Sequence, residues 1–289
     1  MKRPIQNRLF VLIFVLMIGA FDSCTEAPAE EYQKPNILFI LSDDHTSQAW
    51  GVYGGLLEDY VQNTNIKRLA NEGAVLNNAF CTNSICTPSR GSILTGQYSH
   101  INQVYTLNEP IPNGHPNIAK TLKQNGYETA VIGKWHLVEQ PEGFDYFNVL
   151  PGQGEYWNPI LKTKENWKDG RDATAGRQYQ GFSTDIITDL TIEHLKKRDS
   201  TKPFMMFCNF KATHEPFDFP KRFASLYEND TIPEPESLFD FGKETTGRTF
   251  KGQVLENLSK RWQQATDTDT FWTHYPGLPY LLKGLDSVQ

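Results

Sequence analysis

Hydrophobic residues gather in short continuous runs, and the polar segments between the runs carry helical spacing. The clearest runs are 36–42 (NILFILS), 128–135 (ETAVIGKW) and 204–210 (FMMFCNF). Each has the length of a strand, and the first is typical of a strand that is buried on both faces of a parallel sheet. The pattern predicts an α/β fold with a central, mostly parallel sheet that is flanked by helices.

Apolar side chains recur at helical spacing in three further segments, 65–75, 118–124 and 183–197. Gly73 and Gly126 are placed to end the first two helices, because glycine adopts the left-handed conformation that closes a helix. Ser183 is a plausible N-cap of the third. We expect the first helix to be the crossover that follows the first strand.

Polar side chains follow each hydrophobic run at the point where its strand should end. Asp43 and Asp44 follow the first run, Lys134 and His136 close the second, and His214 follows the third. In an open α/β sheet this edge is where ligands bind. Adjacent buried carboxylates are costly unless a cation faces them, and hard cations are the usual partners. The alternatives are acids in a surface turn, a solvated lysine and an exposed histidine.

The segment Cys86-Thr87-Pro88-Ser89-Arg90 places a cysteine at a helix start and an arginine one turn later. Pro88 suits the first helical position, where its missing N–H costs nothing. Free backbone N–H groups and the helix dipole attract sulfate or phosphate there. Arg90 lies on the same helical face as Cys86, so its guanidinium can reach an anion held beside the sulfur. A buried structural cysteine is the alternative.

This pentad, continued by 91–96 (GSILTG), resembles the sulfatase signature, in which the cysteine is oxidised to Cα-formylglycine. The resemblance implies an alkaline-phosphatase-like fold and a formylglycine-generating maturation enzyme as a partner. It also implies hydrolysis of a sulfate ester, in which hydrated formylglycine at position 86 attacks sulfur and later releases sulfate.

The family resemblance also assigns roles to the polar residues at the strand ends. Asp43 and Asp44 match the Asp-Asp pair that binds calcium, together with residue 86. Lys134 and His136 lie in a Gly-Lys-Trp-His segment, whose lysine contacts sulfate and whose histidine supports formylglycine. The remaining matches are Arg90, which would stabilise sulfate oxygens, and His214, which would contact sulfate and assist the leaving group.

One part of the family pattern is missing. Sulfatases normally add a further Asp and an Asn or Gln from a late strand, and no confident strand appears after Pro220. Calcium takes six to eight oxygen ligands, which Asp43, Asp44 and residue 86 do not supply. We therefore interpret 35–289 as the N-terminal part of a sulfatase catalytic domain that is truncated at its C-terminus, and we expect such a chain to bind substrate poorly and to turn over little or nothing.

The first residues predict export. Lys2, Arg3 and Arg8 precede an apolar run of signal-peptide length at 9–21, so we interpret 1–23 as a signal peptide. Cys24 follows directly and resembles a bacterial lipidation site, although the preceding Phe-Asp-Ser departs from the usual motif. The acidic segment 24–34 then predicts a lipoprotein tether. The prediction is a periplasmic protein or an outer-membrane lipoprotein of a bacterium; the alternative is a conventional secretory signal.

Charge and cysteine content exclude some classes of partner. The net charge of −6 and the lack of a basic stripe argue against nucleic acid. Cys81, Cys86 and Cys208 are an odd number beyond Cys24, so a disulfide framework is not expected. A local bridge between Cys81 and Cys86, or half of a zinc site, stays open, but no second pair completes a zinc site.

The substrate class follows from the resemblance alone. It implies a sulfated glycan, such as 6-O-sulfated N-acetylglucosamine, and the aromatic loop 152–159 offers the faces and polar groups that suit a sugar ring. Two other classes stay open. One is a phosphatase or phosphodiesterase of the same superfamily, which normally has Ser or Thr as nucleophile. The other is a non-catalytic surface lipoprotein that binds sulfated glycans.

Overall fold

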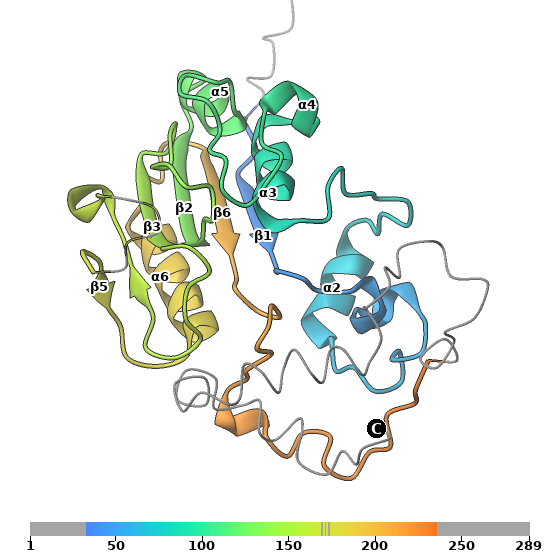
Figure 1. The fold of residues 1–289 in the computed structure, drawn as a ribbon. Helices are drawn as coiled ribbons and strands as arrows, with labels where there is room; N and C mark the ends of the chain where they lie inside the picture. Colours follow the sequence, from blue (N-terminus) through green and yellow to red (C-terminus); the bar gives the residue numbers. More distant parts are fainter. Residues whose placement is uncertain (1–32, 169, 171, 173, 236–289) are drawn as a thin grey trace, which may run out of the picture. The chain divides into compact units, whose positions relative to one another are not determined.

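The structure is a computed structural model that describes residues 33–168, 170, 172 and 174–235 (Figure 1). The chain divides into two units, Met1–Pro35 and Asn36–Gln289, and every helix and strand named below belongs to the second. The predicted signal peptide and Cys24 lie outside the described residues. The described part of the chain contains no helix with the length and apolar composition needed to cross a membrane.

The described strands are β1 (Ile37–Leu41), β2 (Glu128–Lys134), β3 (Tyr146–Leu150), β4 (Ile160–Leu161), β5 (Arg177–Gln178) and β6 (Phe204–Asn209). The described α-helices are α2 (Thr64–Glu72), α3 (Cys86–Thr95), α4 (Ser99–Asn102), α5 (Ile118–Gln124) and α6 (Ser183–Lys197). Short 3-10 turns lie at η1 (Ser47–Ala49), η2 (Gly51–Tyr53), η3 (Lys164–Asn166) and η4 (Lys221–Phe223).

The central sheet has four strands in the order β1-β6-β2-β3, and every neighbouring pair is parallel. Leu41 pairs with Asn209, and Asn209 pairs with Gly133, so β1, β6 and β2 end level with one another. This register brings the segments after all three strands to one edge of the sheet. The three predicted strands and their parallel arrangement are confirmed.

Helices cover both faces of this sheet (Figure 1). On one face, Leu94 of α3 and Ala119 of α5 pack with Val131, Phe147 and Phe207 in one hydrophobic core. On the other face, Ile187 of α6 and Leu161 of β4 share a core with sheet residues Ile132, Leu150 and Met206. Successive residues of a strand point to opposite faces of the sheet, so these apolar runs contribute side chains to both cores.

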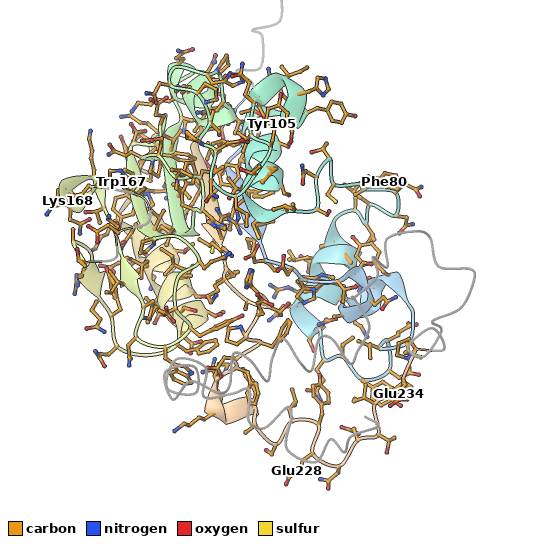
Figure 2. All side chains as sticks on the ribbon, viewed as in Figure 1. Phe80, Tyr105, Trp167, Lys168, Glu228 and Glu234 are labelled. Atoms are coloured by element: carbon orange, nitrogen blue, oxygen red, sulfur yellow. The ribbon has the colours of Figure 1, made fainter. Side chains whose placement is uncertain are left out.

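The first strand differs from its predicted environment. Among the described strands β1 pairs only with β6, and Leu38 and Ile40 are exposed. The prediction that β1 is buried on both faces is therefore wrong for the described residues. Apolar side chains are also exposed on the segment between α2 and α3, where Phe80 is 87% exposed (Figure 2).

The helices match their predicted positions, with three corrections. The segment 65–75 forms α2 and ends before Gly73, but it packs on η2 and buries no residue, so it does not cover the sheet as a crossover helix. Phe182, not Ser183, is the N-cap of α6, because Ser183 is already helical. Pro88 is the third residue of α3, where the N–H it lacks is still one of the unpaired first four.

Gly133 is the point at which β2 comes closest to β6. It has φ +99°, and a Cβ there would lie 1.9 Å from the carbonyl oxygen of Asn209. Only glycine combines this conformation with this approach. Because Gly133 directly precedes Lys134, the contact also fixes where that lysine leaves the sheet.

We expect Gly133→Ala to lower the free energy of unfolding by about 3 kcal/mol or more, because backbone must move and φ is strained. Gly96→Ala is the matched control, since Gly96 has φ +67° and nothing lies within 4 Å of its Cβ position. Its cost should be about 1 kcal/mol. Urea denaturation of both variants checks this, and equal costs would contradict the close-approach argument.

Candidate active site

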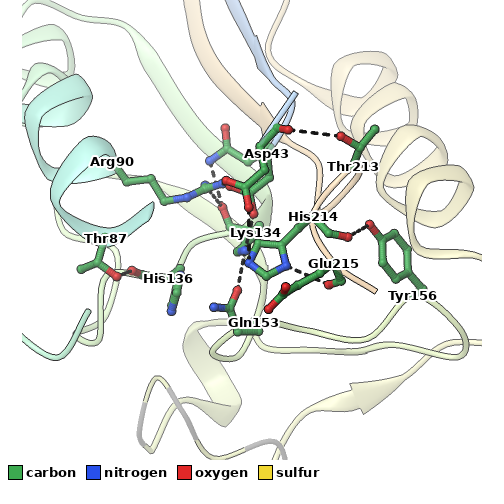
Figure 3. Close-up of polar contacts among 12 residues, drawn as sticks. Asp43, Thr87, Arg90, Lys134, His136, Gln153, Tyr156, Thr213, His214 and Glu215 are labelled. Carbon is green, nitrogen blue, oxygen red and sulfur yellow. Dashed lines mark hydrogen bonds and ion pairs between the residues drawn. The ribbon is translucent and has the colours of Figure 1, made fainter. Parts of the chain in front are cut away.

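The N-terminus of α3 meets the end of β2. Ile85 is the N-cap of the helix and Cys86 is its first residue, half-buried. The Thr87 hydroxyl donates to the backbone carbonyl of His136 over 2.8 Å (Figure 3). A fully buried threonine thus fixes the cysteine-bearing turn against the segment that carries His136.

A buried cluster of three charges lies beside this turn. Asp43 accepts hydrogen bonds from the Arg90 guanidinium, at 3.2 Å, and from the Lys134 ammonium (Figure 3). Arg90 also donates to the backbone carbonyl of Lys134 over 2.7 Å, and Lys134 donates to the Gln153 side chain over 2.6 Å. Lys134 is 0% exposed. The side chains that follow β1 and β2 are thus joined to α3 by charge-assisted hydrogen bonds.

The pKa values in this cluster follow from burial and charge. Burial alone would raise the pKa of Asp43, but Arg90 and Lys134 together outweigh it and hold that pKa below its ordinary value. Burial lowers the pKa of Lys134, and Asp43 opposes that shift. Asp43 is therefore ionised at neutral pH and neutralises one of the two cations.

The Cys86 thiol lies close to the acids of the site. Ligand atoms of Asp43, Cys86 and His214 all lie within 4.8 Å of one another. Burial, together with the negative charge of Asp43, raises the pKa of the Cys86 thiol above its ordinary value. An unmodified thiol would thus stay protonated at neutral pH, which makes it a poor nucleophile.

His136 is held in a neutral form. Its backbone has φ +53°, and its Nδ1 atom is buried without a hydrogen-bond partner among the described residues. Burial, with the charges of Lys134 and Arg90, lowers the pKa of His136 to about 4. A neutral imidazole at physiological pH is available to accept a proton.

His214 follows β6 on a tightly held turn. Its Nδ1 atom donates to the carbonyl of Glu215 over 2.8 Å (Figure 3). This leaves Nε2 facing the Asp44 carboxylate at 3.6 Å. The turn is joined to the end of β1, because the Thr213 N–H donates to the Asp43 carbonyl over 2.7 Å. His214 is buried, whereas the Asp44 side chain is 50% exposed.

The donor set suits calcium only in part. Asp43 and Asp44 supply carboxylate oxygens, and the carboxamide oxygen of Asn209 is buried without a hydrogen-bond partner among the described residues. However, the group that converges within 4.8 Å contains one carboxylate, a thiol and an imidazole, while calcium prefers six to eight oxygens. The predicted calcium ligands Asp43, Asp44 and residue 86 stay a prediction.

The structure brings together side chains that lie up to 171 positions apart in the sequence, from Asp43 to His214. They are Asp43, Asp44, Cys86, Arg90, Lys134, His136 and His214. Cys81, Cys86 and Cys208 are free cysteines, so the local bridge between Cys81 and Cys86 is not formed.

Sequence reasoning missed several residues of the site. Gln153 reaches Lys134 from the loop 152–159, for which the sequence indicates only a sugar-binding surface. Asn209 donates to the carbonyl of Lys134 over 3.1 Å. Lys211 is buried and lies beside Tyr156. Only sequence position could have identified Asn209 and Lys211 as site residues. They lie at or just after the end of the last apolar run, and the sequence predicts that the site lies at this edge of the sheet.

A family model described as Sulfatase matches residues 35–272. The chain belongs to the sulfatase family. It is 41% identical over 257 residues to an N-acetylglucosamine-6-O-sulfatase of Bacteroides thetaiotaomicron, covering 87% of this chain and 44% of that protein. It is 29% identical over 225 residues to the human N-acetylgalactosamine-6-sulfatase, covering 66% of this chain and 42% of the relative.

A solved structure of a protein in complex with its substrate, D-glucosamine-2-N,6-O-disulfate, is similar to this sulfatase chain. The TM-score is 0.69 at 34% identity, and the match covers 87% of this chain and 51% of that one. The predicted family and the alkaline-phosphatase-like architecture are confirmed. The chain spans about half the length of the relatives it matches.

Removing the charge of Asp43 should be costly. Asp43→Asn leaves the cations of Arg90 and Lys134 buried without their counter-ion, and we expect a loss of about 3–5 kcal/mol in the free energy of unfolding. Asp44→Asn is the control, because its half-exposed carboxylate should contribute about 1 kcal/mol or less. Urea denaturation of the two variants at pH 7 tests this, and similar losses would refute the central role of Asp43.

The lowered pKa of His136 predicts a pH-dependent stability. Between pH 6.5 and 4 the unfolded chain binds a proton at this ring and the folded chain does not, so stability falls as pH falls through this window. His45 and His194, whose pKa values burial also lowers, act in the same direction. His136→Asn should therefore lose less unfolding free energy between pH 7 and pH 5 than the parent chain.

Exposed His100 provides the control substitution, His100→Asn, which should keep the parent's pH dependence. Urea titrations at the two pH values give the comparison. Identical slopes for His136→Asn and the parent would show that His136 is not held neutral in the folded state.

Proposed function

We propose that this sulfatase hydrolyses sulfate esters on glucosamine-containing glycans, with residue 86 as nucleophile after its conversion to Cα-formylglycine. One observation carries the proposal. Cys86 begins α3 within 4.8 Å of side-chain atoms of Asp43 and His214, beside the buried cations Arg90 and Lys134. The raised pKa of the thiol argues that the unmodified cysteine is not the attacking group.

The charge of the site favours an anionic substrate. Among the described residues Asp43 is the only buried carboxylate, and the two buried cations Arg90 and Lys134 both bind it. The excess of positive charge in a low-dielectric site would attract a sulfate ester and stabilise the oxygens that gain charge during its hydrolysis.

Hydrated formylglycine at position 86 would supply a geminal diol: one hydroxyl oxygen would displace the alcohol from sulfur, and loss of the proton of the second hydroxyl would later break the bond from carbon to the sulfated oxygen, restore the aldehyde and release sulfate. Arg90 and Lys134 would orient the sulfate and stabilise its oxygens. His136 is neutral and would accept the proton that the diol loses. His214, whose Nε2 faces Asp44, would donate a proton to the departing alcohol.

Calcium belongs to the same proposal. Asp43 and Asp44 would hold the ion, with residue 86 as a further oxygen ligand once converted, and the ion would add positive charge beside the sulfate oxygens. The remaining oxygens must come from residues other than those that converge in the described part of the site. Maturation by a formylglycine-generating enzyme, export and lipid anchoring at Cys24 are parts of the proposal that rest on sequence alone.

The substrate class is supported by the relatives. One relative is named as an N-acetylglucosamine-6-O-sulfatase, and a similar structure holds D-glucosamine-2-N,6-O-disulfate as its substrate. Both names share a 6-O-sulfated glucosamine, so we propose this unit as the substrate. The cysteine at position 86 disfavours the phosphatase alternative, since that class normally has a serine or threonine nucleophile.

In an intact sulfatase polypeptide that contains this chain and is produced together with a sulfatase-maturing enzyme, Cys86→Ala should abolish release of sulfate from 6-O-sulfated N-acetylglucosamine, because the nucleophile is lost. Cys81→Ala is the matched control, since Cys81 is a free, exposed cysteine, and its activity should equal that of the parent. Ion chromatography of sulfate gives the rates.

Mass spectrometry of the peptide that contains residue 86 should show the aldehyde in place of the thiol. Undiminished sulfate release by Cys86→Ala would rule out the proposed nucleophile. An active parent protein that carries only the unmodified thiol would rule out formylglycine chemistry.

A further inference from the structure

Lys211 is a buried cation that the mechanism above does not place. It follows β6, is 4% exposed, and forms no ion pair within 4 Å with any carboxylate in the described part of the chain. Its close contact is aromatic: the ammonium lies 4.8 Å from the centre of the Tyr156 ring. A buried charge without a counter-ion is costly, so its presence beside the site calls for a functional reason.

Tyr156 connects this cation to the turn that carries His214. The Tyr156 hydroxyl donates a hydrogen bond to the backbone carbonyl of His214 (Figure 3). The ring itself is buried and stacks on Phe182, with centroids 5.4 Å apart and planes inclined by 18°. The Tyr156 ring thus packs against Phe182 and Lys211, while its hydroxyl binds the turn that carries His214.

The same turn is held from its other side by backbone. The His214 N–H donates to the Lys211 carbonyl over 3.1 Å, and the Thr213 N–H donates to the Asp43 carbonyl. These bonds fix the path of the chain, but the Tyr156 hydroxyl holds the His214 peptide from a separate segment. The position of the imidazole relative to Asp44 and Cys86 therefore depends on Tyr156.

A cation over an aromatic ring is attracted by the ring's electron density, and the attraction is stronger when the pair is desolvated. The same cation draws electron density from the phenol, which makes its hydroxyl a better donor. Lys211 therefore restricts the orientation of the Tyr156 ring and strengthens the hydrogen bond from the Tyr156 hydroxyl to the His214 carbonyl.

We infer that Lys211 is a positioning residue for sulfate ester hydrolysis, acting through the Tyr156 ring to hold His214 where it meets the leaving group. This inference deepens the proposed function and rests on it for its consequence in catalysis. The charged groups around Lys211 are Lys134, Glu155, Asp43 and Glu215, of which only Lys134 and Asp43 are buried.

Four variants separate positioning from bulk stability. Lys211→Met keeps the apolar stem and removes the charge, and Lys211→Arg restores a cation that can stack on the ring. Tyr156→Phe keeps the ring and removes only the hydroxyl. Lys221→Met is the matched control, because Lys221 is exposed and touches none of these groups.

In the mature intact enzyme that contains this chain, we expect Lys211→Met and Tyr156→Phe each to lower kcat by about 10- to 100-fold with KM changed by less than about threefold, because a small displacement of His214 affects the reaction more than binding. The Lys211→Met, Tyr156→Phe double variant should lose no more than the worse single variant. Lys211→Arg should recover most of the kcat, and Lys221→Met should match the parent.

A second readout does not need turnover. Side-chain NMR of histidine-labelled chain should show a shift of the His214 ring resonances in Lys211→Met and Tyr156→Phe, and none in Lys221→Met. Unchanged His214 resonances, an unaltered kcat, or losses that multiply in the double variant would each overturn the inference. An inactive parent would contradict the proposed function instead, and the NMR shifts would then decide whether Lys211 acts on His214.

Discussion

The site depends on one buried interaction, in which the Asp43 carboxylate binds both the Arg90 guanidinium and the Lys134 ammonium. Each partner comes from a different element: the end of β1, the helix α3 and the last residue of β2. Burying any of these groups alone would be costly, so each requires the other two. This mutual requirement fixes the helix that carries Cys86 against the edge of the sheet.

The sheet makes this cluster possible through its register. Leu41, Asn209 and Gly133 lie level on three adjacent parallel strands, so the chain segments that follow them begin at the same height. The close approach at Gly133 keeps β2 tight against β6 immediately before Lys134. Backbone bonds between Asp43 and the turn after β6 then bring His214 to the same place.

The buried cluster carries more positive than negative charge, and this excess bears on both the stability of the protein and its proposed function. Arg90 and Lys134 outnumber Asp43, the one buried carboxylate in the described part of the chain. Burial, together with the charges of Lys134 and Arg90, lowers the pKa of His136, which keeps that ring neutral. In the proposed function, an anionic sulfate ester would supply the missing negative charge, and the arrangement that costs stability in the free protein would then favour its binding.

The sequence by itself determined β1, β2 and β6, the helix that begins at Cys86 and the family, because apolar runs and the pentad are local patterns, but it did not predict β3, β4 or β5. It also located Asp43, Lys134 and His214 at strand ends, since parallel strands end at one edge. Only the tertiary structure decided that β1 is exposed, that Asp43 binds two cations, and that Lys211 lies over Tyr156. These three features depend on contacts between segments that lie far apart in the chain. Burial and strand register determine such contacts, and no local sequence pattern specifies them.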